Sequence, residues 1–153
     1  MDTGKYNFLK NDFLPLVKVL KTDSKPKWGK MNSRQMIEHV SDFFKVSTGR
    51  IEMPLVTHEE HLPKFKAFLL SDKEFRENTK APVLPDDPFP VRHAKLQGSL
   101  DELQNESSYF FEYFNKDPGR KTVHPVFGEL NFEEWILLHY KHVIHHLKQF
   151  DLR

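Results

Sequence analysis

The stretch from Asn131 to Phe150 constrains the fold more than any other part of the chain. Its sequence, NFEEWILLHYKHVIHHLKQF, has the pattern of an amphipathic helix and carries four of the chain's nine histidines within eight positions. At about 100° per residue, His139, His142 and His146 share a face with apolar residues, whereas Lys141 points away. Imidazoles on an inward face need partners for their ring nitrogens, and a metal ion is one such partner.

The spacing of two of these histidines suits a shared metal ion. His142 and His146 are four residues apart, which places both imidazoles on adjacent turns of one helix face. His39 lies on the apolar face of an earlier predicted helix and offers a third nitrogen. Three neutral histidines without a fourth protein ligand leave a coordination position open, as in catalytic sites. Water bound there would be acidified toward a pKa of about 7, and a substrate thiol or carboxylate could bind there instead.

Each histidine also has a purely structural interpretation. A single His39 on an apolar face is commonly a core histidine, hydrogen-bonded to a backbone carbonyl or a carboxylate. Histidines four apart occur by chance on many helices. Several imidazoles on one buried face are harder to accommodate, because each needs a partner among apolar neighbours. Spacing alone therefore leaves a metal site and a hydrogen-bonded core as alternatives.

The remaining histidines near this motif have open roles. His139 is a candidate for a fourth ligand, for a residue that contacts a ligand without binding the metal itself, or for a proton carrier. His124 precedes Pro125 in the loop before the last helix, where it is either a structural residue bonded to the backbone or an acid–base group at the rim of a cavity. His145 is expected at a helix–helix seam.

Cysteine is absent, which excludes disulfides, thiolate metal sites, iron–sulfur clusters and a cysteine nucleophile. Metal binding would therefore use histidine, carboxylate or water. The formal net charge of +1 gives no overall field to steer nucleic acid or an anionic membrane. No apolar run reaches membrane-spanning length and the N-terminus lacks a secretory pattern, so we expect a soluble cytoplasmic protein. The 14 phenylalanines predict a phenylalanine-rich core.

Apolar periodicity predicts four amphipathic helices and a shorter one. The expected helices run from Tyr6 to Leu20, from Asn32 through Val46, from Ser99 to the residue before Asp117, from Asn131 to Phe150 and, for the short one, from about Leu62 to Leu70. Three of the predicted helix N-termini have the spacing of a capping box: Asn32 with Gln35, Ser99 with Glu102, and Asn131 with Glu134. Pro15 should kink or restart the first helix.

The connections between these helices are partly long. Residues 78–98 contain four prolines, which exclude a regular helix and predict a stiff extended connection along the surface. No segment shows the clean alternation of a strand. The predicted fold is all-α, a four-helix bundle with long connections and a short extra helix, formed by one domain over residues 1–153.

Two segments are similar to a known family. WGKMNSRQMIEHV, residues 28–40, and HPVFGELNFEEWILLHYKHVIHHLKQF, residues 124–150, resemble the DinB/YfiT-like superfamily of metalloenzymes, and most closely a branch described as a domain of unknown function. The resemblance spans the chain and is specific mainly in these segments. It implies a four-helix bundle in which one histidine of the second helix and two of the last bind a divalent ion. Matched by motif, these are His39, His142 and His146.

The resemblance also bears on the reaction. In relatives a ligand histidine is followed three residues later by glutamine, a pattern met by His146 and Gln149. Relatives of known activity transfer low-molecular-weight thiols or hydrolyse small amides. This chain has Leu147 and Lys148 where thiol-transferring relatives often have arginine and glycine, which weakens the expectation of thiol transfer. Zinc or nickel is the first expectation for the ion, and manganese or iron the second.

We therefore expect a metal-dependent hydrolase or transferase that acts on a small-molecule substrate. His39, His142 and His146 are its expected ligands, and His139 and His124 its candidate catalytic residues. The alternatives are a non-catalytic metal- or ligand-binding helical protein and a helical scaffold with hydrogen-bonded histidines. No nucleic-acid or membrane partner is expected. Aromatic-rich bundles of this size often pair, so a homodimer is expected alongside a monomer.

Overall fold

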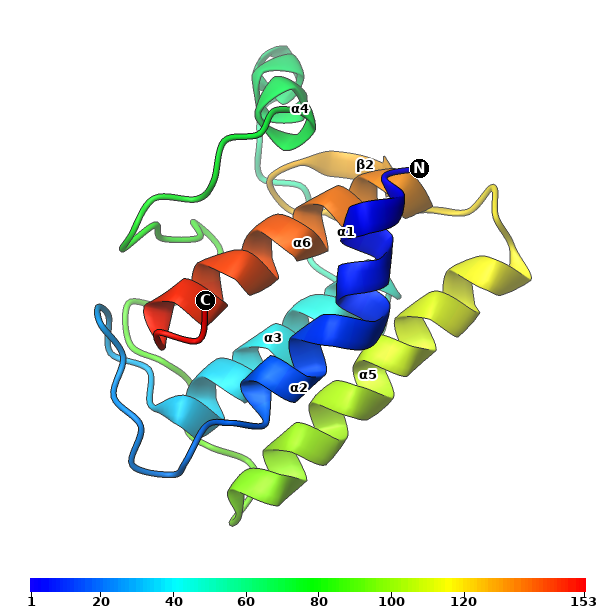
Figure 1. Ribbon diagram of the computed structural model, residues 1–153. Helices are drawn as coiled ribbons and strands as arrows, with labels where there is room; N and C mark the ends of the chain where they lie inside the picture. The colour runs from blue at the N-terminus through cyan, green and yellow to red at the C-terminus, as the bar shows by residue number, and fades with distance from the viewer.

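Nearly all of the regular structure is helical (Figure 1). The computed structural model describes residues 1–153. Its elements in chain order are α1 (Thr3–Asn7), the π-helical turn η1 (Phe8–Asp12), α2 (Phe13–Val17), α3 (Ser33–Ser47), the 3₁₀ turn η2 (Glu59–His61), α4 (Leu62–Leu70), α5 (Leu96–Lys116), β1 (Lys121–His124), β2 (Gly128–Asn131) and α6 (Phe132–Gln149). The predicted helical character is confirmed, with one small hairpin as the exception. No helix combines the length and apolar character that a membrane crossing needs.

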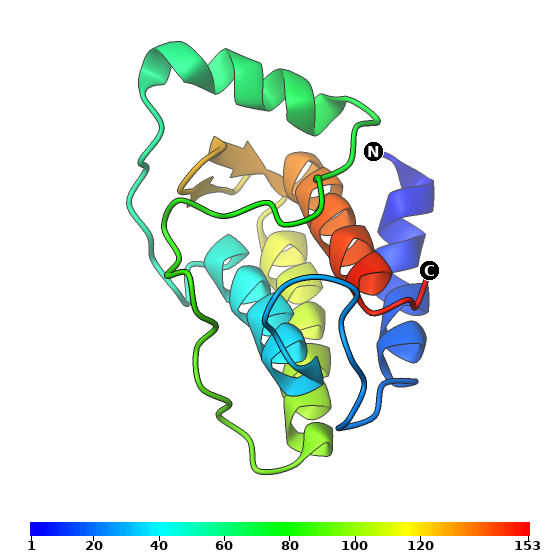
Figure 2. The same ribbon diagram turned by 90° about the vertical axis from the view of Figure 1, so that its left-hand side faces the viewer.

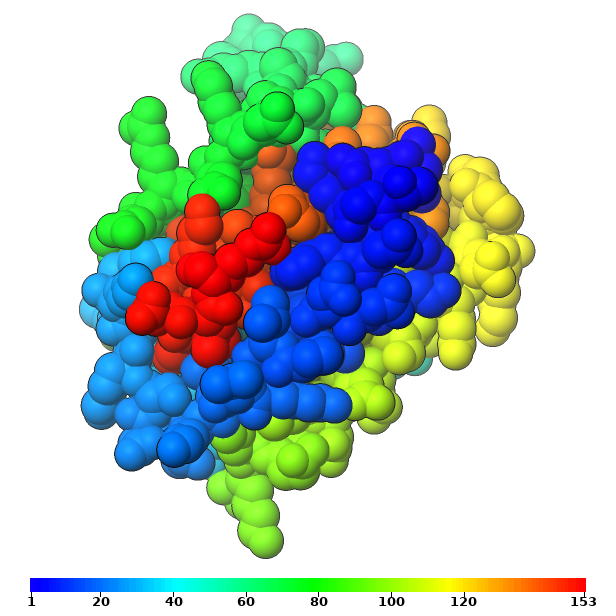
Figure 3. Space-filling model, in the orientation of Figure 1, coloured from blue at the N-terminus to red at the C-terminus, as the bar shows by residue number.

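The core lies between α3, α5, α6 and the N-terminal helical segment made of α1, η1 and α2. Six of its 23 buried apolar residues are phenylalanine, as the composition predicts. Trp135 and Phe110 are fully buried, and burial of one such side chain stabilises the fold by about 1.5–3 kcal/mol. Figure 3 shows the N-terminal residues covering one face beside the C-terminus, where the Arg153 guanidinium lies 4.8 Å from the centre of the Phe8 ring.

The N-terminal helical segment passes through Pro15 without ending. Proline has no backbone N–H and its ring presses on the carbonyl four residues earlier, which is why an interruption is predicted there. In the structure the helix widens into η1, and the N–H of Phe13 donates to the carbonyl of Phe8, five residues earlier. The predicted interruption therefore takes the form of a π turn immediately before the proline-containing turn.

Two of the three predicted capping boxes are present. In the box that opens α3, the Asn32 side chain accepts from the Gln35 N–H at 2.9 Å and the Gln35 side chain accepts from the Asn32 N–H at 2.9 Å. Asn131 and Glu134 form the same reciprocal pair at the start of α6, at 2.9 and 3.0 Å. These caps fix where the two histidine-bearing helices begin.

The predicted start of α5 at Ser99 is wrong. The helix begins at Leu96, its N-cap Lys95 makes no side-chain cap, and Ser99 is fully buried inside it. The preceding chain is held on α3, because the Arg34 guanidinium donates to the carbonyls of His93 and Ala94 at 3.0 and 2.9 Å. This tertiary contact decides the start of α5, and the small side chain of Ser99 serves packing.

The hairpin β1–β2 was not expected from the sequence. Its strands are antiparallel, with Lys121 opposite Asn131 and His124 opposite Gly128. The turn between them lacks the usual Asn-Gly signal, and the His124 ring closes it: Nδ1 accepts from the N–H groups of Val126 and Phe127 at 3.0 and 3.2 Å. Strands of four residues closed by a histidine carry too little local pattern to be recognised.

Helix α4 lies outside the core helices, and an extended connection runs from it to the start of α5 (Figure 2). Residues 71–95 contain no helix or strand, which confirms the connection predicted from its prolines. The helix itself has the bounds predicted for the short extra helix. It is docked by the buried side chain of Leu69 and by an ion pair between Lys66 and Glu134 of α6.

Lys141 joins this connection to α6. Helical periodicity places it on an outward face, yet it is only 7% exposed. Its Nζ donates to the carbonyls of Ser71 and Lys73 at 2.6 and 2.5 Å, and burial lowers the pKa of its ammonium group. The connection covers this side of α6, and a lysine stem tolerates burial when its ammonium reaches backbone oxygens.

Glu38 of α3 anchors the other end of the connection. Its nearly buried carboxylate accepts from the backbone N–H of Arg92 at 2.6 Å and of His93 at 3.1 Å. The Arg92 guanidinium in turn pairs with Asp42 at 3.0 Å and with Glu102 at 2.5 Å. One carboxylate and one guanidinium thus tie α3, α5 and the connection together.

We predict that Glu38→Met lowers the free energy of unfolding by about 3 kcal/mol, because two buried N–H groups lose their acceptor and Arg92 loses a partner. Urea unfolding followed by circular dichroism measures this value. Asp86→Asn is the control, since the pair of Asp86 with Lys80 is exposed and should change the value by less than about 0.5 kcal/mol. A loss below about 1 kcal/mol in Glu38→Met would contradict the anchoring role.

Candidate metal centre

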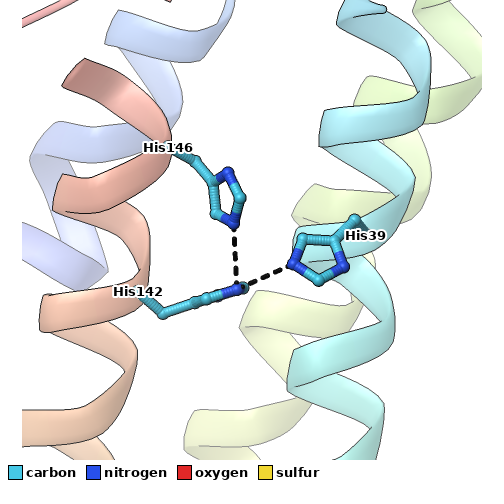
Figure 4. A group of neighbouring side chains, drawn as sticks. All are labelled: His39, His142 and His146. Atoms are coloured by element: carbon cyan, nitrogen blue, oxygen red, sulfur yellow. Dashed lines mark hydrogen bonds between the residues drawn. The ribbon is translucent and has the colours of Figure 1, made fainter. Parts of the chain in front are cut away.

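Three histidines from two helices converge between α3 and α6 (Figure 4). His39 comes from the middle of α3, while His142 and His146 come from successive turns of α6. The Nε2 atoms of His39 and His142 are 2.9 Å apart, and those of His142 and His146 are 3.1 Å apart. A ligand atom from each of the three residues lies within 4.8 Å of the other two. The structure thus brings together the residues that spacing and resemblance single out.

The convergence matches what a small divalent ion needs. Three histidine nitrogens, each about 2.0–2.1 Å from one tetrahedral zinc ion, would lie about 3.3–3.4 Å from one another. The two close Nε2 separations differ from that value by a few tenths of an ångström. All three ligand atoms lie within 4.8 Å of one another, so the donor set could hold a divalent ion after the rings shift.

The hydrogen bonds of Gln149 fix the protonation of His146. The side-chain amide of Gln149 donates through Nε2 to the carbonyl of Trp28 at 3.1 Å. Its Oε1 therefore faces Nδ1 of His146 at 2.8 Å, and this nitrogen must carry a proton to donate. A neutral imidazole has one N–H, so Nε2 of His146 presents a lone pair to the centre of the cluster.

Hydrogen bonds among the three rings cannot satisfy the cluster by themselves. Nε2 of His142 lies within hydrogen-bond distance of both His39 and His146. This nitrogen either carries one proton or presents one lone pair, so it can donate to one neighbour or accept from one, but it cannot satisfy both. A cation at the centre would instead accept all three lone pairs at once, which is the arrangement that the donor set favours.

Burial keeps these imidazoles neutral. Desolvation lowers the pKa of His39 to about 4, with a smaller lowering from His145 and a partial offset from Asp42. The pKa values of His142 and His146 are well below the usual value, first because of desolvation and then because neighbouring imidazoles repel a second charge. Neutral imidazole is the form that binds metals, so protons do not compete with an ion near pH 7.

Residues 27–29 hold the end of α6 in place. The N–H of Lys27 donates to the carbonyl of Gln149 at 2.7 Å, and the carbonyl of Trp28 accepts from the side chain of Gln149. Gly29 has φ = +78°, and a Cβ there would lie 2.9 Å from Nε2 of Gln149. Trp28 and Gly29 begin one of the two family-like segments, but the sequence does not indicate that this turn contacts Gln149.

The two candidate catalytic histidines lie outside the triad. His139 is fully buried, and its Nε2 lies 2.9 Å from the Oγ of Ser47. His124 is 8% exposed, and its Nδ1 is engaged by the turn of the hairpin. Burial lowers the pKa of His124 to about 3. Both rings have structural contacts that explain their positions, and their catalytic roles remain predictions.

His145 lies beside the triad, as a packing residue would. Its ring centre is 5.5 Å from Trp28 and 6.1 Å from Phe75. It therefore connects the 27–29 turn and the extended connection to α6. The predicted packing role fits these contacts, but the predicted helix–helix seam is wrong, because the neighbours are connecting segments and not another helix.

Comparison with known proteins identifies one family. A family model described as the DinB superfamily matches residues 11–150. The match includes His39 of α3 and the two triad histidines of α6, His142 and His146. No curated protein and no solved structure matches the chain.

We predict that Gly29→Ala weakens the binding of Zn²⁺ or Ni²⁺ by about 10- to 100-fold, because the new methyl group displaces Gln149 from His146. Gly49→Ala is a matched control: Gly49 has φ = +74°, but a Cβ at this position would have no atom within 4 Å. Both variants should lose about 1 kcal/mol of stability from the positive φ. Competition with a chromophoric chelator measures affinity, and equal affinities in the two variants would contradict the role of the 27–29 turn.

We also predict that the metal-free protein loses stability as pH falls below about 6.5. The pKa of His124 is lowered to about 3 in the folded state, so between these values the unfolded state binds more protons and acid favours unfolding. Above a pH of about 6.5 this contribution is complete. Each histidine of this kind changes the free energy of unfolding by up to about 1.4 kcal/mol per pH unit.

His124→Asn tests this contribution, since its side-chain oxygen can still accept from the turn but does not titrate. We expect urea unfolding at pH 7, 6, 5 and 4 to show that this variant takes up about one proton fewer on unfolding. The free energy of unfolding then depends less steeply on pH. Identical slopes in the two proteins would show that His124 is not buried as a neutral group.

Proposed function

The chain belongs to the DinB superfamily, and on that premise we propose that it is a metal-dependent enzyme. His39, His142 and His146 would hold one divalent ion, with zinc or nickel the expected metal and manganese or iron the next candidates. The reaction would be hydrolysis or thiol transfer on a small-molecule substrate. The helical core would be a four-helix bundle formed by the N-terminal helical segment, α3, α5 and α6, with α4 as the extra helix.

The observation that carries this proposal is the convergence of three neutral imidazoles, two of them buried and that of His39 half-buried, through their Nε2 atoms. Two of the rings are held from outside the cluster: the amide of Gln149 binds His146, and the Phe43 ring stacks on His142 with centres 4.0 Å apart. A donor set prepared in this way loses little freedom when an ion binds.

The number of ligands supports catalysis. Three histidines leave at least one coordination position for water or substrate, and an ion held in this way supplies an activated hydroxide or a bound thiolate near neutral pH. The protein's own part is to orient the three rings and to exclude water from their apolar side, where Phe43 and Trp135 pack.

The residues that differ from thiol-transferring relatives lie away from the triad. Leu147 is buried in the core, and the Nζ of Lys148 binds Glu74 at 2.7 Å on the surface. Neither side chain is placed to contact a substrate at the three nitrogens. Their identity therefore gives no support to either reaction, and both reaction classes remain in the proposal.

A second candidate function is non-catalytic binding of a metal or ligand. It is favoured by burial, since His142 and His146 are only 7% and 5% exposed. A site with so little exposure restricts the size of any substrate. In that case the ion would stabilise the contact between α3 and α6 or report the presence of a ligand.

Elemental analysis of protein purified without a histidine tag tests the metal site. We expect about one equivalent of a divalent transition metal in the wild type and its loss in His142→Ala, because two remaining histidines bind weakly. His145→Ala removes an imidazole from the same helix and should retain the metal. Metal-free wild type that also takes up no zinc, nickel or manganese would rule out the proposal.

Metal-dependent turnover then separates enzyme from binding protein. The metal-loaded protein is assayed against a panel of small amides, epoxides and thiols, with the His142→Ala variant as the blank. Turnover that is lost in this variant would support an enzyme. A protein that binds one equivalent of metal but is silent across the panel would favour the binding function.

A further inference from the structure

Two imidazole nitrogens at the triad are buried without a hydrogen-bond partner. One is Nδ1 of His142, a member of the triad, and the other is Nδ1 of His139, which lies outside it. The two residues are three positions apart on α6, so their side chains lie on adjacent turns with Cβ atoms about 5–6 Å apart. Buried ring nitrogens are rarely left unpaired, and two on neighbouring turns indicate a shared arrangement.

The hydrogen bonds of Ser47 fix which nitrogen of His139 carries the proton. The Ser47 hydroxyl donates to the carbonyl of Phe44 at 2.6 Å. Its single proton is thereby used, so at 2.9 Å it accepts from Nε2–H of His139. A neutral His139 therefore has a lone pair at Nδ1, which makes this nitrogen an acceptor.

The opposite holds for His142. Its Nε2 faces His39 and His146, and an ion bound by the three rings requires a lone pair at that atom. The proton of a neutral His142 is then on Nδ1, which makes this nitrogen a donor. The two unpartnered nitrogens thus have complementary needs: one must donate and the other must accept.

We propose that His139 is a positioning residue for the metal ligand His142 through one bridging water molecule, which accepts from His142 Nδ1–H and donates to Nδ1 of His139, since the two nitrogens are not within direct hydrogen-bond distance. This inference rests on the proposed metal site, because the ion fixes the tautomer of His142. An oriented chain of hydrogen bonds then runs from the carbonyl of Phe44 through Ser47, His139, the bridging water and His142 to the metal position. Such a chain fixes the tautomer and strengthens the ligand as a donor.

Two consecutive phenylalanines of α3 hold the rings in the orientation that this chain needs. Phe43 stacks on His142 with centres 4.0 Å apart and planes at 21°, and Phe44 stacks on His139 at 4.1 Å and 13°. Stacking resists rotation of either ring about its Cβ–Cγ bond, so the two phenylalanines hold both Nδ1 atoms in their present directions.

The first test is the tautomer of each ring in the Zn²⁺-loaded protein, read from ¹⁵N-histidine by long-range ¹H–¹⁵N correlation. The expected result is His139 protonated at Nε2 and His142 protonated at Nδ1. In Ser47→Ala, where the partner of Nε2 is removed, His139 should show a mixture of tautomers. His139 protonated at Nδ1 in the wild type would overturn the proposal, because it could not accept from the bridging water.

The second test is metal affinity, measured by chelator competition for Zn²⁺. His139→Phe fills the same space without an acceptor and should weaken binding by about 10- to 100-fold. His139→Asn keeps an oxygen near the position of Nδ1 and should restore most of that loss. His61→Phe, which removes an exposed imidazole outside the cluster, should stay within about threefold of wild type.

The outcomes separate this inference from the proposed function. A wild type that binds no Zn²⁺ defeats the proposed metal site itself. A wild type that binds Zn²⁺, with His139→Phe folded by circular dichroism and equal in affinity, defeats only the role of His139 and points to a backbone acceptor for His142. Failure of His139→Asn to recover affinity would show that volume, not the acceptor, matters at this position.

Discussion

The burial of neutral imidazoles between α3 and α6 is the interaction on which the rest of the structure depends. A phenylalanine-rich interior offers few hydrogen-bond partners, so each inward ring nitrogen needs a group placed for it. Gln149 and Ser47 meet two of these needs. The Nε2 atoms of His39, His142 and His146 converge, and hydrogen bonds among them cannot satisfy all three together. Under the proposed function a cation accepts their three lone pairs.

The irregular segments of the chain serve this contact. The turn at residues 27–29 binds Gln149 and so orients one ligand from the end of α6. The hairpin before α6 is tied to α3, since the Thr122 hydroxyl donates to the Ser47 carbonyl and accepts from the Trp135 indole. The long connection is fixed to both helices by Glu38 and Lys141. The ligand helices are therefore held at both ends and along their length.

This rigidity bears on function. Rings whose rotation and protonation are set by fixed neighbours bind an ion without further ordering, which favours affinity and a defined open position. The same packing leaves the nitrogens little exposed, so a substrate must be small or must approach along a narrow path. The two proposed functions, catalysis and non-catalytic binding, would use the same three histidines and would differ in whether a substrate reaches the bound ion.

The sequence by itself determined the features that depend on neighbours a few residues away. Periodicity predicted the helices and the face shared by His142 and His146, capping boxes fixed the starts of α3 and α6, and the likeness of residues 28–40 and 124–150 to a known family pointed to His39 as the third member. Only the tertiary structure decided the start of α5, the hairpin, the burial of Lys141 and the roles of Ser47 and Gln149. Each of these rests on contacts between residues far apart in the chain, or on a ring that closes a turn, and such contacts leave no periodic signal in the sequence.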